Sequence, residues 1–410
     1  MSAMKKCGLL GRKLGHSYSP QIHALLADYE YLLYEKEPEE LECFLKNGDF
    51  DGLNVTIPYK KSVIPYCAEL SETAKKIGSV NTLVRRADGS LYGDNTDAFG
   101  FEALLRHSGI SPEGKKCLVL GTGGASVTVC AVLEALGAKK VITVSRSGDN
   151  NYTNVSKHSD AAIIVNATPV GMFPNNGESL LDLRDFPNCV GVLDVVYNPA
   201  RTALLLQAEE LGIPCANGLY MLVAQAKKSC EDFIGSAVPD SEISRIESIL
   251  RHEMQNIVIV GMPGSGKSTV AALLAQKLSR KLVDADAELV SRAGISIPEI
   301  FEKHGEEYFR RLETEVLRDL GKQSGLIIST GGGCVTRGEN YLLLHQNGVI
   351  VWIQRDTALL TRDGRPISQK SDLNELYEKR KACYERFADI SADNNGELSD
   401  TVSEIEEKLR

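Results

Sequence analysis

The sequence lacks several features that would place it in whole classes of protein. It has no excess of positive charge, because 46 Lys and Arg are outnumbered by 55 Asp and Glu, and the net charge is −9. Proteins neutralise nucleic-acid phosphates with a basic surface, so we expect no nucleic acid as a main partner. Small anionic ligands need only a few local cations and are compatible with this charge.

Long apolar runs and paired cysteines are also missing. No stretch approaches about 18 apolar residues, so we expect no transmembrane helix and no membrane partner. Residues 1–10 lack the apolar segment of a secretory signal. The ten cysteines form no CxxC pair, which favours reduced thiols over a disulfide framework or a zinc site. These absences predict a cytoplasmic protein.

Internal repeats of short period and low-complexity tracts are absent as well. Short apolar runs instead alternate with helical periodicity almost throughout, which predicts α/β architecture with parallel sheets. A chain of 410 residues exceeds what one hydrophobic core usually supports, so we expect two or three compact units.

One strand–glycine–helix segment predicts a phosphate-binding loop. The apolar strand 257–260 leads into Gly261, and residues 261–268 fit the pattern G-x-x-x-x-G-K-S. In such a P-loop the backbone N–H groups cradle the phosphates, the lysine reaches the β and γ oxygens, and the serine ligates Mg²⁺. The residues predicted to bind ATP are Gly264, Ser265, Gly266, Lys267, Ser268 and Thr269, with Ser268 also a magnesium ligand.

A second glycine loop predicts a dinucleotide site. The strand 117–120 leads into Gly121-Thr122-Gly123-Gly124-Ala125, a G-x-G-G-A variant of the Rossmann fingerprint, and a helix follows. After the next strand, Arg146 stands where NAD sites usually carry an acid, so a 2′-phosphate and therefore NADPH are favoured. Only nineteen residues separate Arg146 from Asn166, which predicts an abbreviated adenosine side.

The C-terminal third resembles the shikimate kinases. The likeness rests on the P-loop and on the segments that follow it in order, which are Asp284-Ala285-Asp286, 296–301, 305–306, 309–313, 329–333, Gly364-Arg365-Pro366, and Arg380 with Tyr384. Together they extend over essentially all of residues 256–410.

This resemblance implies roles for individual residues. Asp284 helps to hold Mg²⁺ through water, and Asp286 binds the shikimate hydroxyls and orients or deprotonates the attacking one. The substrate carboxylate is held by Arg310, which Glu313 steadies, and by Arg380. Gly331, Gly332 and Gly333 let the backbone approach the ring. Arg365 comes from a closing lid, binds ATP and neutralises charge on the moving phosphoryl group. Only two residues separate Arg362 from Arg365, which indicates a short lid, and Arg362 is not assigned to adenine stacking.

The N-terminal part closely resembles the shikimate dehydrogenases. The matching segments are 16–20, 54–60, 78–83, 93–97, 166–172, 194–199 and 217–225. Reducing the ketone of 3-dehydroshikimate needs a hydride donor and a proton for the developing alkoxide. Lys60 is the candidate for proton transfer, with Asp97 beside it to hold the ammonium group.

Further residues follow from the same resemblance. Ser17 and Ser19 offer hydroxyl donors to the substrate carboxylate, while Asn81, Asn95 and Gln225 suit the ring hydroxyls. Thr56 and Tyr197 complete the predicted substrate site, and His16 is interpreted as structural. The predicted NADP contacts are Gly121, Gly123, Gly124, Ala125, Arg146, Thr168, Gly218 and Met221.

We therefore expect a fusion of two enzymes that act in sequence, with NADPH, ATP and Mg²⁺ as cofactors and a monomer or homodimer as the assembly. The expected domains are an α/β substrate lobe (1–99), a Rossmann-like NADP lobe whose C-terminal helices return to the first lobe (100–250), and a P-loop kinase domain with a parallel sheet (256–410). Two alternatives are a quinate/shikimate dehydrogenase fused to the kinase and a metabolite-sensing regulator with degenerate domains.

Overall fold

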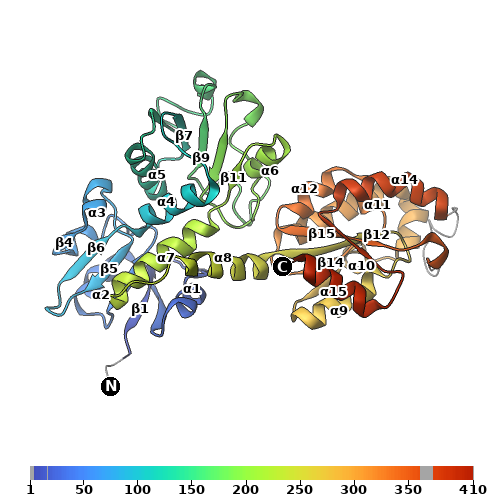
Figure 1. Cartoon of the computed structure of the whole chain (residues 1–410), viewed down its shortest axis with the longest axis horizontal. Helices are drawn as coiled ribbons and strands as arrows, with labels where there is room; N and C mark the ends of the chain where they lie inside the picture. Colours follow the sequence, from blue (N-terminus) through green and yellow to red (C-terminus); the bar gives the residue numbers. More distant parts are fainter. Residues whose placement is uncertain (1–3, 16, 361–372, 410) are drawn as a thin grey trace. The chain divides into compact units, whose positions relative to one another are not determined.

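The computed structural model describes residues 4–15, 17–360 and 373–409. The chain divides into two compact units, Met1–Tyr197 with Thr202–Leu250 and Asn198–Arg201 with Arg251–Arg410. Both units are α/β, as the sequence predicts (Figure 1). No helix within the described ranges is both long and apolar enough to cross a membrane.

The first unit begins with a six-stranded mixed sheet in the order β2-β1-β3-β5-β6-β4. Parallel pairing joins β1 to β2 and β3, whereas β5 runs antiparallel to β3 and β6. The strands are β1 (Lys6–Gly11), β2 (Glu30–Glu35), β3 (Gly52–Val55), β4 (Glu69–Leu70), β5 (Thr82–Arg85) and β6 (Leu91–Asp94), and the helices are α1 (Ser19–Leu26), α2 (Leu41–Asn47) and α3 (Glu72–Ile77).

The second lobe of this unit holds a five-stranded parallel sheet in the order β11-β10-β9-β7-β8. Its strands are β7 (Lys116–Leu120), β8 (Lys140–Val144), β9 (Ile163–Asn166), β10 (Gly191–Asp194) and β11 (Cys215–Ala216), with helices α4 (Thr96–Ser108), α5 (Gly124–Ala135), α6 (Ala203–Glu210) and α7 (Leu219–Ile234). Alternate residues of β7 enter different cores, Val119 with α4 and α5 and Leu118 with α6. The segment between β8 and β9 contains the 3₁₀ turn η3 (Val155–His158) in place of an α-helix, so this connection is short.

Helix α7 joins the two lobes of the first unit. It packs along α4 and against α1, and Figure 1 shows it running beside both sheets. Near its C-terminal end, Phe233 is buried with Cys7 and Tyr29 of the first lobe. Gly52 makes room for this ring, since a Cβ on Gly52 would lie 2.3 Å from Phe233 Cδ1. The residues before α4 therefore share a core with residues near 230.

The second unit is built on a five-stranded parallel sheet in the order β13-β14-β12-β15-β16. Its strands are β12 (Asn256–Gly261), β13 (Leu282–Asp284), β14 (Ile327–Ser329), β15 (Gly348–Gln354) and β16 (Ile390–Asp393). The described helices are α9 (Lys267–Leu278), α10 (Ala285–Ala293), α11 (Ile297–Lys322), α12 (Glu339–His345), α14 (Leu373–Phe387) and α15 (Leu398–Leu409), and α8 (Ser241–Met254) precedes them in the chain.

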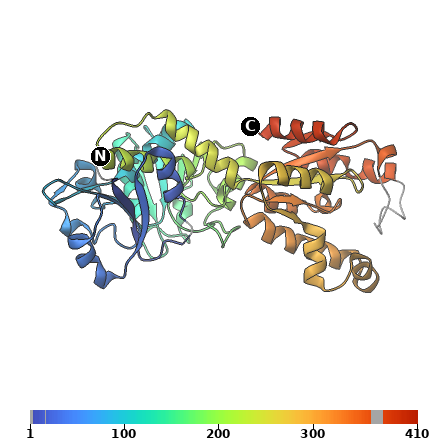
Figure 2. The ribbon, with the colours of Figure 1, turned by 90° about the horizontal axis from the view of Figure 1, so that it is seen from below.

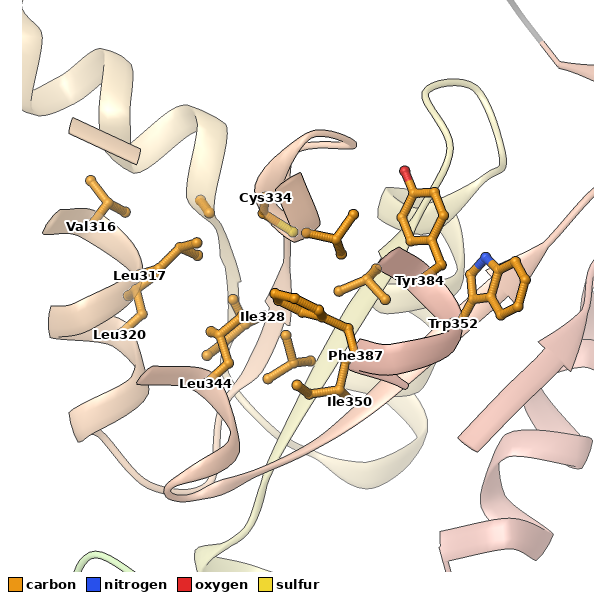
Figure 3. Packing of buried hydrophobic residues seen from close by; sticks show 14 of the residues in the cluster. Val316, Leu317, Leu320, Ile328, Cys334, Leu344, Ile350, Trp352, Tyr384 and Phe387 are labelled. Carbon is orange, nitrogen blue, oxygen red and sulfur yellow. The ribbon is translucent and has the colours of Figure 1, made fainter. Parts of the chain in front are cut away.

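Two cores cover the faces of this sheet. Ile257 and Ile259 of β12 pack with α9 and α15, whereas Val258 and Val260 pack with α11, α12 and α14. Figure 2 shows α15, in red, on one side of the sheet and the orange helices on the other. In the second core, Trp352 stacks on Tyr384 with ring centroids 5.7 Å apart, beside Phe387 (Figure 3). The P-loop after β12 is thus held between two packed layers.

Candidate active sites

The predicted proton-transfer residues meet in the first unit. Lys60 Nζ donates a hydrogen bond to Asp97 Oδ2 at 2.6 Å, and the side chains are 20% and 13% exposed. Lys60 lies in the turn after β3, and the Val80 N–H donates to its carbonyl at 2.8 Å. Asp97 lies in the first turn of α4. Both charges are sheltered from solvent and yet reach the same cavity.

The start of α4 is fixed by a buried polar network. Asn95 caps the helix by accepting from the Ala98 N–H, and its own amide donates to Ser79 O at 2.9 Å. Asn81 accepts from the Thr96 N–H at 2.7 Å and donates to Thr96 Oγ1 at 3.1 Å. Because Thr96 precedes Asp97, this network fixes the backbone that carries the carboxylate. Asn95 is thus an anchor of α4 and does not line the cavity, unlike its predicted role at the ring hydroxyls.

A cavity of about 380 Å³ opens beside Lys60 and Asp97. All the residues predicted to bind the dehydrogenase substrate except Asn95 line it, together with Ala125, Gly218 and Met221 from the predicted cofactor set. The lining residues are Leu9, Ser17, Ser19, Asn54, Val55, Thr56, Ile57, Lys60, Asn81, Asp97, Ala125, Val195, Tyr197, Gly218, Met221, Leu222 and Gln225. Residues spread over most of the first unit thus converge on one cavity that combines apolar walls with a few polar groups, as ligand pockets commonly do.

Asn54 lines this cavity but was not selected from the sequence. Its Oδ1 accepts from the Tyr31 hydroxyl at 2.7 Å, and His23 is stacked on Tyr31 with ring centroids 4.1 Å apart. His23 is buried and hydrogen-bonds to the Tyr29 hydroxyl; burial lowers the pKa of His23 to about 3. A neutral aromatic cluster therefore supports the wall of the cavity. The only signal in the sequence was the position of Asn54 in the segment 54–60.

The predicted cofactor loop has the geometry of a dinucleotide site. Gly121 has φ +109°, and a Cβ there would lie 2.8 Å from Thr168 Cγ2, so a side chain is excluded. Gly123 is the N-cap of α5, and a Cβ there would meet open space. The Ser126 hydroxyl donates to Gly121 O at 2.6 Å and holds the turn. The free N–H groups at the start of α5 suit a pyrophosphate, so these residues fit NADP.

The other predicted cofactor residues surround this loop. Arg146, predicted to contact a 2′-phosphate, is exposed shortly after β8. Thr168 donates to Asn166 Oδ1 at 2.7 Å, and Asn166 donates to Asp194 Oδ1 at 2.9 Å. Burial raises the pKa of Asp194 to about 7, against the hydrogen bonds from Thr202, Val196 and Asn166. Gly218 lies so close to β10 that a Cβ would be 2.1 Å from Val195 O.

In the second unit, the P-loop between β12 and α9 turns through glycines with positive φ. Gly261, Gly264 and Gly266 have φ of 152°, 84° and 90°, which L side chains rarely adopt. Lys267 is 6% exposed, and its Nζ donates to Met262 O at 2.9 Å across the loop. Ser268 and Thr269 are exposed in the first turn of α9. The loop is therefore shaped to present its N–H groups to phosphate.

The predicted magnesium ligands, Ser268 and Asp284, follow β12 and end β13 at the same edge of the sheet. Ser268 Oγ lies 3.3 Å from Ser329 Oγ, and Ser329 is the register partner of Asp284 in the adjacent strand. A serine hydroxyl and a carboxylate are hard oxygen ligands of the kind that Mg²⁺ accepts alongside nucleotide phosphates. Among the described residues there is no cluster of three or more His, Cys, Asp or Glu suited to a metal. The residues present fit a magnesium that shares its coordination with a nucleotide.

The acceptor side of the kinase unit gathers the predicted charged residues around the glycine run after β14. A Cβ on Gly331 would lie 2.7 Å from Asp286 Oδ1, and one on Gly333 would lie 2.3 Å from Arg310 Nη1. Arg380 Nη1 donates to Gly332 O at 3.0 Å, and the Tyr384 hydroxyl donates to the same carbonyl. Because the three glycines carry no side chains, the predicted charged residues can lie close to the backbone here.

Glu313 supplies the counter-charge to this cluster. Arg310 Nη1 donates to Glu313 Oε2 at 2.8 Å, and the two side chains are 8% and 4% exposed. Burial lowers the pKa of Arg310, but Glu313 and Glu306 outweigh it, so the net shift is upward. Burial also raises the pKa of Glu313, against the charge of Arg310. We interpret the pair as ionised, because each group is hydrogen-bonded to its partner's charged form. The predicted lid residues Arg362 and Arg365, with Gly364 and Pro366, lie outside the described residues.

These features define the class of the protein. The first unit is a two-lobed dehydrogenase with a Lys–Asp pair facing a glycine-rich dinucleotide loop, and the second is a P-loop kinase with an arginine-lined acceptor site. Sequence models of two families match the same regions. The shikimate dehydrogenase substrate binding domain matches residues 9–83, and shikimate kinase matches residues 263–410.

Known proteins agree with this class. The shikimate dehydrogenase (NADP(+)) of Caldicellulosiruptor bescii is 38% identical over 251 residues, which cover 54% of this chain and 87% of the relative. That of Clostridium perfringens is 34% identical over 273 residues, covering 60% and 99%. A solved chorismate mutase/shikimate 5-dehydrogenase fusion protein from Clostridium acetobutylicum aligns with a TM-score of 0.57 and 36% identity, covering 60% of this chain and 97% of that one. Shikimate 5-dehydrogenase of Thermus thermophilus was solved in complex with NADP(H) and shikimate. It aligns with a TM-score of 0.55 and 30% identity, covering 60% of this chain and 98% of that one.

The chain belongs to the shikimate dehydrogenase family and carries a shikimate kinase domain after it. It is a bifunctional enzyme of the shikimate pathway, with NADP as cofactor of the oxidoreductase and ATP with Mg²⁺ serving the phosphotransferase.

Proposed function

We propose that the chain reduces 3-dehydroshikimate to shikimate with NADPH and then transfers the γ-phosphoryl group of MgATP to shikimate, giving shikimate 3-phosphate. In this proposal residues 1–99 form the substrate lobe, 100–250 the NADP lobe and 256–410 the kinase domain. The hydroxyl made in the first reaction is the one phosphorylated in the second, which gives the fusion a chemical logic.

The observation that carries the first reaction is the hydrogen bond of 2.6 Å between Lys60 Nζ and Asp97 Oδ2 in the lined cavity. Lys60 gives a proton to the C3 oxygen as the ketone becomes an alcohol, and Asp97 holds the ammonium group in place. NADPH bound at Gly121–Ala125 supplies the hydride for C3. The carboxylate is bound by Ser17 and Ser19, and the hydroxyls are bound by Thr56, Asn81, Tyr197 and Gln225.

In the kinase domain, substrate binding falls to Arg310 and Arg380, which grip the carboxylate, and to the backbone at Gly331–Gly333. Asp286 orients the attacking hydroxyl and accepts its proton, a role that its place against Gly331 supports. Lys267 stabilises the charge on the β and γ oxygens, with Arg365 proposed to approach from the lid. Ser268 and Asp284 hold the magnesium with the nucleotide.

A product analysis tests the proposal. The purified chain is incubated with 3-dehydroshikimate, NADPH, ATP and Mg²⁺, and products are identified by mass spectrometry, alongside Lys60→Ala, Lys267→Ala and the exposed neighbour Lys61→Ala as control. We expect shikimate 3-phosphate from wild type and Lys61→Ala, no product from Lys60→Ala, and shikimate alone from Lys267→Ala. Wild type that stops at shikimate would refute the kinase assignment. Faster turnover of quinate with NAD than of shikimate with NADP would refute the dehydrogenase substrate.

A further inference from the structure

Arg355 is a cation beside the P-loop that no matched motif includes. It directly follows β15, at the same edge of the sheet as the P-loop after β12. A Cβ on Gly266 would lie 3.6 Å from Arg355 Nη1. Its Nε atom is buried without a hydrogen-bond partner in the described chain. A half-buried guanidinium with such an atom is costly unless an anion accepts from it.

The surrounding loops hold Arg355 in one place. Gln354 is paired in register with Asp393 of β16, and the Asp356 N–H donates to Asn395 Oδ1 at 2.8 Å. Asn394 is 3% exposed and donates to Ser265 O of the P-loop at 2.7 Å. The backbone on both sides of Arg355 is therefore tied to β16 and, through Asn394, to the P-loop itself. Such support presents the guanidinium at a fixed site.

The order of the strands gives the direction of a nucleotide bound here. Most acceptor residues, namely Asp286, Arg310 and Gly331–Gly333, follow β13 or β14 on one side of β12, and Arg380 reaches Gly332 there from α14. Arg355 and Asn394 directly follow β15 and β16 on the other side. The phosphate chain lies on the P-loop after β12, and the γ-phosphoryl group must face the acceptor. The nucleoside end then faces β15 and β16, so Arg355 lies away from the transferred group.

We propose that Arg355 binds the α-phosphate of the nucleotide and so sets the affinity of the kinase for ATP without taking part in phosphoryl transfer. The inference rests on the proposed kinase function, since it takes the P-loop as the nucleotide site. Arginine suits this task because its fork donates two parallel hydrogen bonds to phosphate oxygens.

The test compares Arg355→Ala and Arg355→Lys with Arg318→Ala, an exposed arginine on α11. Steady-state kinetics give KM for ATP, KM for shikimate and kcat, and calorimetry gives Kd for MgADP and for magnesium tripolyphosphate, which lacks a nucleoside. Dehydrogenase activity and the melting temperature report folding. We expect Arg355→Ala to raise KM for ATP and both Kd values by about tenfold or more. The values for Arg355→Lys should fall between those of wild type and Arg355→Ala. In all variants kcat and KM for shikimate should change by less than about twofold, and in Arg318→Ala so should KM for ATP and both Kd values.

Three results would overturn the inference. Unchanged Kd for MgADP in Arg355→Ala would exclude a nucleotide contact. Weakened MgADP with unchanged tripolyphosphate would place the contact on the nucleoside, and a fall in kcat at constant KM would place it on the γ-phosphoryl group. MgADP binding is read even if the wild-type chain does not phosphorylate shikimate, so failure of the proposed kinase reaction stays distinguishable from failure of this inference.

Discussion

Glu313 lies one helical turn after Arg310 on α11, and the two side chains form a hydrogen-bonded ion pair of 2.8 Å that is almost completely buried. The guanidinium lies against Gly333, whose missing side chain leaves room for it. Because a buried guanidinium is held by its counter-charge, the orientation of Arg310 toward the acceptor site depends on Glu313.

Glu313→Gln removes this charge while keeping the shape of the side chain. We expect KM for shikimate to rise by about tenfold and the free energy of unfolding of the kinase unit to fall by about 1–3 kcal/mol, because the buried Arg310 is left with only the exposed Glu306 as an acidic partner. KM for ATP should stay the same. Steady-state kinetics and urea unfolding measure both. Glu315→Gln, an exposed change on the same helix, is the control, and equal KM values for shikimate in the two variants would contradict the role.

Asp97→Asn tests the pair in the dehydrogenase cavity. An amide keeps the size of Asp97 but no longer holds the Lys60 ammonium by charge, so we expect kcat for 3-dehydroshikimate reduction to fall by about 10²-fold or more. The kinase rate of the same chain should not change. Glu102→Gln, which removes a surface ion pair with Arg106 on the same helix, is the matched control. A kcat within twofold of that control would remove Asp97 from the mechanism.

Arg146 is predicted to set the choice between NADPH and NADH. Arg146→Ala removes the exposed guanidinium after β8, and we expect the ratio of kcat/KM for NADPH over NADH to fall by about 10- to 100-fold, through KM for NADPH. Lys140→Ala, at the opposite end of the same strand, loses equal charge and should keep the wild-type ratio. An unchanged ratio in Arg146→Ala would assign the 2′-phosphate to other residues.

His23 predicts an acid-sensitive first unit. Burial lowers the pKa of His23 to about 3, whereas in the unfolded chain it is about 6.5. The stability from neutral His23 is therefore full above pH 6.5 and is lost as pH falls toward 3, at about 1.4 kcal/mol per pH unit. The measurement is the free energy of unfolding by urea at pH 7.5 and at pH 5.5, for wild type and for His23→Gln. The wild type should lose at least about 1 kcal/mol more than the variant, and parallel losses would exclude His23 as the cause.

Local motifs predicted much of the fold and of both sites. The strand–glycine–helix segments at Gly121 and Gly261 are recognisable from the sequence alone, since positive φ and close packing require glycine at both positions. The parallel sheets of the NADP lobe and of the kinase unit follow from the alternation of short apolar runs with helices. The polar cavity residues from Ser17 to Gln225 that were predicted each stand in a segment typical of the family, whereas Leu9 and Asn54 were not predicted.

Long-range packing was not visible in the sequence. His23, Tyr31 and Asn54 come from separate elements, and nothing local marks them as one cluster. Asn95 was expected at the ring hydroxyls, but its amide donates to Ser79 O and accepts from the Ala98 N–H at the start of α4. Arg355 belongs to no motif, and only the adjacency of β15 and β12 shows that it borders the P-loop. In each case at least one partner is distant in the sequence and is brought close only by the fold.

The seat of Phe233 between Cys7, Tyr29 and Gly52 has a consequence for how the protein is made. A ribosome releases the N-terminal lobe long before it releases the helix that closes that core. At about 5–20 residues per second, the interval between the emergence of Phe99 and that of Phe233 is on the order of ten seconds. During this time the apolar surface around Cys7 and Tyr29, which Phe233 later covers, is exposed on the nascent lobe. Chaperones that bind apolar surfaces of nascent chains can bind there.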